Sequence, residues 1–174
     1  MRRGSRVIAV LIGAGAFGAA CVGCVSDGPT RPVRVDQSRR PPTSALPTEM
    51  FLAASQAVDL DGDNLPDTIP VTVYLFADPS RFTTPLWADG SFTFVLMDNA
   101  GVPVKDWTIS GDRQRGGRLV LAPGPGYAFD LTLSPREVGG SEGGLYSIAS
   151  SFEASGGASI RTRGTATVRL STGR

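Results

Sequence analysis

Strict alternation of apolar and polar residues near the C-terminus constrains the fold of this chain more than any other feature. Between positions 160 and 170 the even-numbered positions carry Ile160, Thr162, Ala166, Val168 and Leu170. The odd-numbered positions carry Arg161, Arg163, Thr165, Thr167 and Arg169. A half-buried antiparallel strand requires this period of two. The arginine face is interpreted as a solvated surface that opposes edge pairing, with a polyanion site as the alternative.

The same period recurs upstream, between clusters of turn-forming residues. The chain has 22 Gly and 13 Pro, which favours many turns over long helices. The predicted strands span 71–76, 91–98, 102–109, 118–121, 127–134 and 146–152, besides 160–170. Residues 50–58 are predicted to form an edge strand, with a short helix as the alternative, and 71–76 is expected to be buried on both faces. About seven strands with such turns predict an all-β, antiparallel β-sandwich similar to immunoglobulin, fibronectin type III or transthyretin-like domains.

Large aromatic residues are the expected core of this sandwich. They are Trp87, Trp107, Phe92, Phe94, Phe129 and Phe152. Trp87 differs from the others because it follows Thr83, Thr84 and Pro85 in a predicted loop. It is therefore also a candidate for contact with a ligand.

The absence of histidine narrows the chemistry that the chain can perform. It removes the commonest general base and every Ser-His or Cys-His nucleophile pair. We therefore expect a protein that is not an enzyme. The alternative is a glycosidase that uses two carboxylates from a scattered set of glutamates, Glu49, Glu137, Glu142 and Glu153.

The N-terminus resembles the signal peptide of bacterial lipoproteins. A basic start with Arg2, Arg3 and Arg6 precedes an uncharged apolar run at 7–20, which is shorter than the roughly 20 residues of a membrane-spanning helix. The run ends in Ala20-Cys21-Val22-Gly23-Cys24, which is similar to a lipobox. The resemblance implies cleavage before an acylated cysteine and a lipid anchor in a bilayer.

Two cysteines fit this motif. Cys24 is favoured, with Gly23 and Val22 before it, and Cys21 is the alternative register. Residues 1–23 are then the signal peptide, and the folded domain has neither a disulfide nor a thiol. Ordinary signal-peptidase cleavage, which would release a secreted protein, is the other alternative.

A proline-rich stretch separates the leader from the predicted strands. Residues 24–48 contain five prolines and few bulky apolar side chains, so we expect a disordered tether before a sandwich domain at 49–174. Arg39 and Arg40 are interpreted as part of a solvated linker, with contact to anionic lipid as the alternative. Without Arg2, Arg3 and Arg6 the chain has 14 basic and 16 acidic residues, a balance that gives no reason to expect nucleic acid.

An acidic loop precedes the predicted strand at 71–76. Asp59, Asp61 and Asp63 alternate, and Asp67 follows after Leu65, whose carbonyl would complete the spacing of a calcium loop. The loop resembles the Asp-rich loops of thrombospondin type 3 repeats, which implies Ca²⁺ with these four aspartates as ligands. The alternative is a cluster of Asx-turns in which each aspartate bonds to nearby backbone.

Together these features predict a non-enzymatic envelope lipoprotein with a binding or structural β-sandwich, as in uncharacterised bacterial lipoproteins, which the chain resembles in its N-terminal motif and layout. Its expected location is the cell envelope, on a membrane that faces the periplasm or the exterior. The alternative is a secreted or surface module that binds carbohydrate, or adheres, through Trp87 and a calcium-stabilised loop. The predicted partners are the bilayer, and extracellular polysaccharide or an envelope protein.

Overall fold

The computed structural model describes residues 40–63, 65–134, 144–157 and 159–170. The predicted signal peptide, Cys21, Cys24 and the linker up to residue 39 lie outside the described residues, and their assignments stay predictions. Within the described ranges, no helix is both long and apolar enough to cross a membrane.

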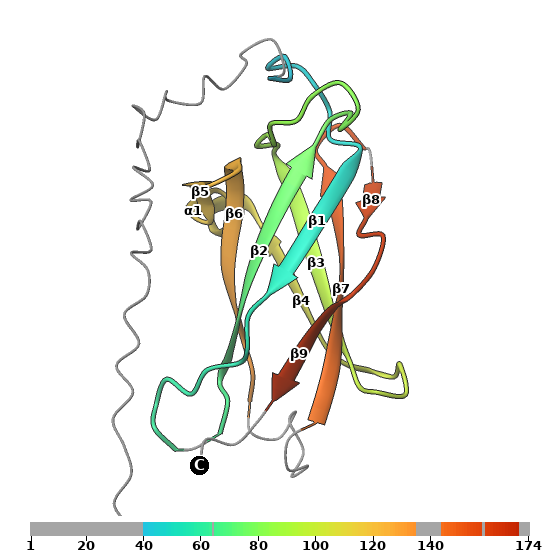
Figure 1. The fold of residues 1–174 in the computed structure, drawn as a ribbon. Helices are drawn as coiled ribbons and strands as arrows, with labels where there is room; N and C mark the ends of the chain where they lie inside the picture. The colour runs from blue at the N-terminus through green and yellow to red at the C-terminus, as the bar shows by residue number, and fades with distance from the viewer. Residues whose placement is uncertain (1–39, 64, 135–143, 158, 171–174) are drawn as a thin grey trace, which may run out of the picture. The chain divides into compact units, whose positions relative to one another are not determined.

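Two antiparallel sheets face each other, which confirms the predicted all-β sandwich (Figure 1). Sheet A has the order β1-β2-β6-β5, with β1 at Glu49–Ala54, β2 at Thr68–Phe76, β5 at Arg118–Leu121 and β6 at Gly124–Thr132. Sheet B has the order β4-β3-β7, and both β8 and β9 pair with the edge of β7 that is not paired with β3. Its strands are β3 at Gly90–Met97, β4 at Pro103–Ser110, β7 at Gly144–Ala154, β8 at Ser159–Arg161 and β9 at Ala166–Leu170.

The strand predicted at 160–170 is interrupted, so the described part of the sandwich has nine strands rather than about seven. Between β8 and β9 the chain leaves the ladder, and Arg163 Nη2 pairs with Glu49 Oε1 of sheet A at 2.5 Å. The outward arginine face is as expected, because Arg161, Arg163 and Arg169 are all exposed. The edge-strand prediction for β1 is confirmed, and its helical alternative is wrong.

The core lies between the sheets and is built around Phe92. Its ring centroid is 4.6 Å from that of Phe152, 4.9 Å from that of Tyr127 and 5.4 Å from that of Phe129. Phe92, Phe152 and Tyr127 are fully buried. Each such side chain stabilises the fold by roughly 1.5–3 kcal/mol through burial alone. The core is thus an aromatic cluster from β3, β6 and β7.

Two expectations about burial are wrong. In β2, Thr72, Tyr74 and Phe76 are only half-buried, because alternation turns them to the outer face of sheet A. The two tryptophans do not join the four phenylalanines in the buried core: Trp87 is 40% exposed, and Trp107 is partly buried at the edge of the cluster.

Strand pairing separates two ends of the sandwich, here named the linker end and the far end. Glu49 pairs with Phe76 and Gly90 pairs with Ala154 at the linker end, where the described residues 40–48 join β1. The 55–67 loop lies at the far end, because it connects the last residue of β1 to the first of β2. A short helix, α1 at Gly111–Gly116, lies between β4 and β5 at the linker end and was not predicted.

Candidate functional site

An open groove of about 600 Å³ lies at the linker end of the domain. Three separate segments form it: residues 40–45, residues 84–87 of the loop between β2 and β3, and the β5–β6 turn around Pro123. Its lining is mostly proline and other apolar side chains, among which Val120 is 75% exposed. Concave, mainly apolar surfaces with a few polar groups are the usual form of a binding site.

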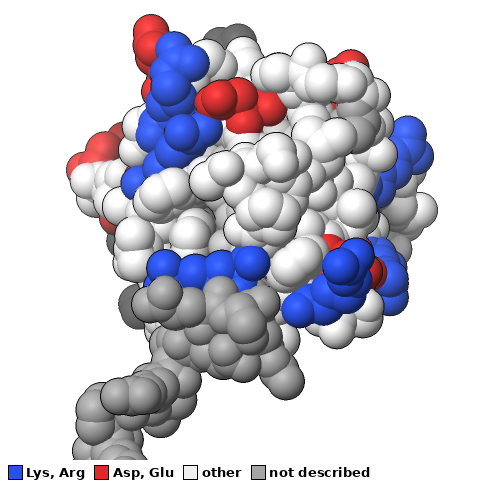
Figure 2. Space-filling model, turned by 90° about the horizontal axis from the view of Figure 1, so that it is seen from above, with Lys and Arg blue, Asp and Glu red and all other residues white. Residues whose placement is uncertain are grey.

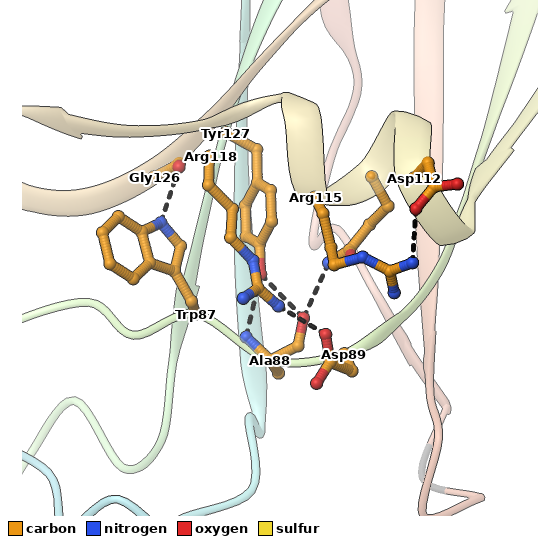
Figure 3. A network of polar contacts seen from close by, with 9 residues as sticks. Trp87, Ala88, Asp89, Asp112, Arg115, Arg118, Gly126 and Tyr127 are labelled. Atoms are coloured by element: carbon orange, nitrogen blue, oxygen red, sulfur yellow. Dashed lines mark hydrogen bonds and ion pairs between the residues drawn. The ribbon is translucent and has the colours of Figure 1, made fainter.

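The Trp87 indole is fixed at the edge of this groove. The amide of Leu86 donates to the carbonyl of Leu75 at 2.8 Å, which joins the loop to the end of β2. Trp87 Nε1 donates to the carbonyl of Gly126 at 2.9 Å (Figure 3). Because the neighbouring backbone and the indole N–H are both held, the ring presents its exposed part without a large loss of side-chain entropy on binding.

The β5–β6 turn packs closely on the Trp87 loop. Gly124 has a φ of 130°, a conformation that side-chain-bearing residues rarely adopt. A Cβ atom at this position would lie 3.2 Å from Pro85 Cδ and 3.3 Å from Thr84 Cγ2. Glycine therefore lets the two walls of the groove meet.

A buried polar network positions the backbone that follows Trp87. The hydroxyl of Tyr127 accepts from the amide of Ala88 at 2.8 Å and donates to the Ala88 carbonyl at 2.7 Å (Figure 3). Gln114 Nε2 of α1 donates to the same carbonyl at 2.7 Å, and its side chain is almost completely buried. Burial raises the pKa of Tyr127, while the Ala88 hydrogen bond and Arg118 act in the opposite direction. One loop residue is therefore held by both β6 and α1.

Residues just before β1 complete one wall of the groove. The amide of Thr48 donates to the carbonyl of Phe76 at 2.8 Å, which extends the β1–β2 ladder, and Pro47 is buried. Ala45 donates its amide to the Pro42 carbonyl at 2.9 Å, and Arg40 lines the groove. Residues 40–48 thus contact the sandwich, although the sequence placed them in the predicted tether.

The structure places Trp87 at the groove, so its predicted role in ligand contact stays a prediction with a defined location. Trp107 is held in a similar way on the side of the domain, with Nε1 donating to the Thr132 carbonyl at 2.9 Å. Lys105 Nζ lies 5.5 Å from the centroid of the Trp107 ring. Gln114 and Tyr127, which hold the loop, carried no sequence pattern that would have marked them as site residues.

The acidic loop brings together three of the four predicted metal ligands. Carboxylate oxygens of Asp59, Asp61 and Asp67 lie within 4.8 Å of one another. Asp63 is outside this group, and its Oδ1 accepts from the amide of Leu65 at 2.7 Å. Three oxygens at such distances fit part of the six- to eight-oxygen shell of Ca²⁺.

Hydrogen bonds within the loop also follow the Asx-turn alternative. Asp59 Oδ1 accepts from the amide of Gly62 at 2.7 Å, and Asp61 Oδ1 accepts from that of Asp63 at 3.1 Å. Asp67 Oδ2 accepts from the amide of Leu60 at 2.7 Å. These carboxylates therefore accept hydrogen bonds from the backbone of their own loop.

The glycosidase alternative concerns four glutamates in different places. Glu49 is paired with Arg163, and Glu153 lies exposed on β7. Glu137 and Glu142 lie outside the described residues.

Comparisons with known proteins give a weak structural likeness. No family model matches the chain, and no curated protein matches it in sequence. A copper-reconstituted P19 protein from Campylobacter jejuni is 17% identical over 70% of this chain and 95% of that chain, with a TM-score of 0.38. A copper-bound variant of the same protein is 15% identical over 75% of this chain and 94% of that chain, with a TM-score of 0.37. Likeness at this level carries no argument about metal or activity.

Proposed function

We propose that this chain is a membrane-anchored, non-enzymatic envelope lipoprotein whose β-sandwich is a binding module. Cys24 is the proposed site of acylation, and the groove beside Trp87 is the proposed site of binding. The observation that carries the binding role is the fixed, 40% exposed indole in an open apolar groove. The lipobox-like sequence supports the anchor.

Binding is favoured over catalysis by the groups that the groove offers. Its side chains are apolar apart from Arg40, Thr43, Thr84 and the indole N–H of Trp87, and that N–H is already bonded to Gly126. General acid–base chemistry needs a titratable group within reach of a reacting atom, usually histidine or a carboxylate. Neither type lines this groove.

Calcium has a structural role in this proposal. Asp59, Asp61 and Asp67 would supply its first ligands, and Asp63 and the Leu65 carbonyl are the remaining candidates from the predicted set. The loop joins β1 to β2 at the far end, so an ion there would fix the start of β2 rather than contact a ligand in the groove.

The anchor is tested by fractionating cells that express the full chain with either cysteine replaced. We expect the wild-type protein to stay with membranes in high salt, because acyl chains hold it there. Cys24→Ala should release it, and Cys21→Ala is the matched control that should leave it bound. If only Cys21→Ala releases the protein, then Cys21 is the acylated residue instead of Cys24. A wild-type protein that is soluble in high salt would contradict the proposal.

A second candidate, a secreted or surface module for carbohydrate, is favoured by the exposed face of Trp87, since aromatic rings offer large rigid contact area. Co-sedimentation with insoluble cell-wall polysaccharide tests it. Retention that is lost in Trp87→Ala but kept in Trp107→Phe would support this candidate. Equal retention of both variants, or none of the wild type, would count against it.

A further inference from the structure

Charge is distributed unequally between the two ends of the described domain. At the linker end there are seven arginines, Arg40, Arg81, Arg113, Arg115, Arg118, Arg161 and Arg163, and five carboxylates, Glu49, Asp78, Asp89, Asp112 and Glu153. The far end has seven carboxylates, Asp59, Asp61, Asp63, Asp67, Asp98, Asp106 and Asp130, and two cations, Lys105 and Arg169. The linker end is therefore net positive and the far end is strongly negative.

The linker end combines these cations with an apolar centre. Figure 2 shows this end as a mostly uncharged surface, with Lys and Arg side chains around its margin and Asp and Glu side chains among them. Exposed apolar side chains here include Val120 (75%), Leu46 (57%) and Trp87 (40%). Arg40 lines the groove itself, and Arg81 belongs to the same loop as Trp87. Trp87 and Val120 line the groove, and Leu46 lines a neighbouring hollow together with Trp87. Isolated apolar residues on a surface need no explanation, whereas neighbouring ones are typical of an interaction surface.

We propose that the linker end docks onto the surface of an anionic lipid bilayer, with Trp87 and Val120 at the headgroup level and Arg40 and Arg81 against lipid phosphates. Arg115, Arg118 and Arg163 are already paired with Asp112, Asp89 and Glu49. Tryptophan prefers the membrane–water interface, since one part of its ring system is apolar and the other polar. Arginine keeps its charge in the headgroups while its alkyl stem covers apolar surface. Anionic lipid attracts each surface arginine enough to raise binding about fivefold.

The far end sets the orientation of this docking. Its carboxylate excess would be repelled by the same anionic surface, so the acidic loop with Asp61 should point away from the bilayer. A neutral polysaccharide would use the Trp87 ring but would gain nothing from this difference in charge. The bilayer is therefore the partner that uses both the apolar centre and the arginines.

This inference rests on the proposed envelope location and deepens the role of the same groove. An acyl anchor would hold the domain close to the membrane, so that even weak docking is populated through a high effective concentration. Docking itself is a property of the folded domain and is measurable without the anchor. All members of the core cluster lie between Met50 and Leu170, so a chain that begins at residue 25 keeps its whole core.

The experiment is flotation of this non-acylated chain with vesicles of phosphatidylcholine alone or with one-third phosphatidylglycerol. We expect binding to the anionic vesicles only, and we expect it to weaken as salt rises, because exposed charges are screened. Arg40→Glu with Arg81→Glu should lower the partition coefficient at least 25-fold, at about fivefold per arginine removed. Arg169→Glu makes the same substitution at one position of the far end and should alter the partition coefficient less than twofold, against at least about fivefold for Arg40→Glu or Arg81→Glu alone.

Fluorescence gives an independent measure of which residue meets the lipid. In a Trp107→Phe background Trp87 is the remaining tryptophan, and its emission should shift to shorter wavelength when anionic vesicles are added. Thermal melting of each variant shows that the fold is kept. Equal binding to both vesicle types, equal loss in Arg169→Glu, or unchanged Trp87 emission would overturn docking. These assays use a protein without acyl chains, so a negative result would overturn docking but not the lipid anchor. The anchor is tested separately by the release of Cys24→Ala from membranes.

Discussion

Replacing Tyr127 with phenylalanine isolates the network that holds the Trp87 loop. The substitution keeps the buried ring and removes only the hydroxyl, which bonds both the amide and the carbonyl of Ala88. The carbonyl keeps Gln114 as a donor at 2.7 Å, whereas the amide loses its partner beneath the loop. Leaving such a donor without a partner costs about 1–3 kcal/mol, and we expect a loss of about 2 kcal/mol.

The loss is large enough to measure by thermal or denaturant unfolding. For a domain of this size about 2 kcal/mol lowers the Tm by roughly 8 °C. Tyr74→Phe is the matched control, because Tyr74 is half-buried on the outer face of sheet A, and its hydroxyl has no hydrogen-bond partner among the described residues. It should change the stability by less than about 0.5 kcal/mol. If Tyr127→Phe costs no more than Tyr74→Phe, the network does not stabilise the loop.

Three further results are expected. Gly117→Ala should destabilise the domain by at least about 2 kcal/mol in denaturant unfolding, because a Cβ atom would lie 2.2 Å from Phe129 Cε1. The control is Gly116→Ala, which should be neutral or slightly stabilising because the space around Gly116 is open. If the acidic loop binds Ca²⁺, millimolar calcium should raise the Tm and Asp61→Asn should abolish the rise; no response in the wild type would favour Asx-turns. Burial raises the pKa of Tyr127 above 10.0, so the unfolded chain loses this proton at a lower pH than the folded chain does. The free energy of unfolding should therefore fall as the pH rises past 10, and it should fall less in Tyr127→Phe. Urea unfolding at pH 9 and at pH 11 measures the difference.

Alternation along the strands was sufficient to predict the fold class. Side chains in a strand point to opposite faces, so period two in β6, β7 and β9 identified the inner face directly. The four core phenylalanines, which lie in β3, β6 and β7, were predicted because large aromatic side chains usually form the core. The interruption between β8 and β9 was missed because Thr162 and Ala166 keep the same parity across it. Arg163 turns toward Glu49, which lies 114 residues away in the chain and carries no local pattern.

The groove could be predicted only in part. Trp87 was predicted as a ligand contact because it follows Pro85 in a loop, and the structure places it at the edge of the groove. The other walls come from segments distant in sequence, and their meeting depends on how the turns close. Helix α1 was missed because its 6 residues are polar or glycine, and only Gln114 among them is buried. Periodicity cannot indicate an element that buries one side chain.

Mass spectrometry of the mature protein purified from membranes shows whether Cys24 carries the lipid anchor. We expect a chain that begins at Cys24, with a mass increased by a diacylglycerol group and an amide-linked fatty acid on that residue. A chain that still begins at Met1, or one that begins near residue 24 with an unmodified amino end, would contradict the anchor and the location inferred from it.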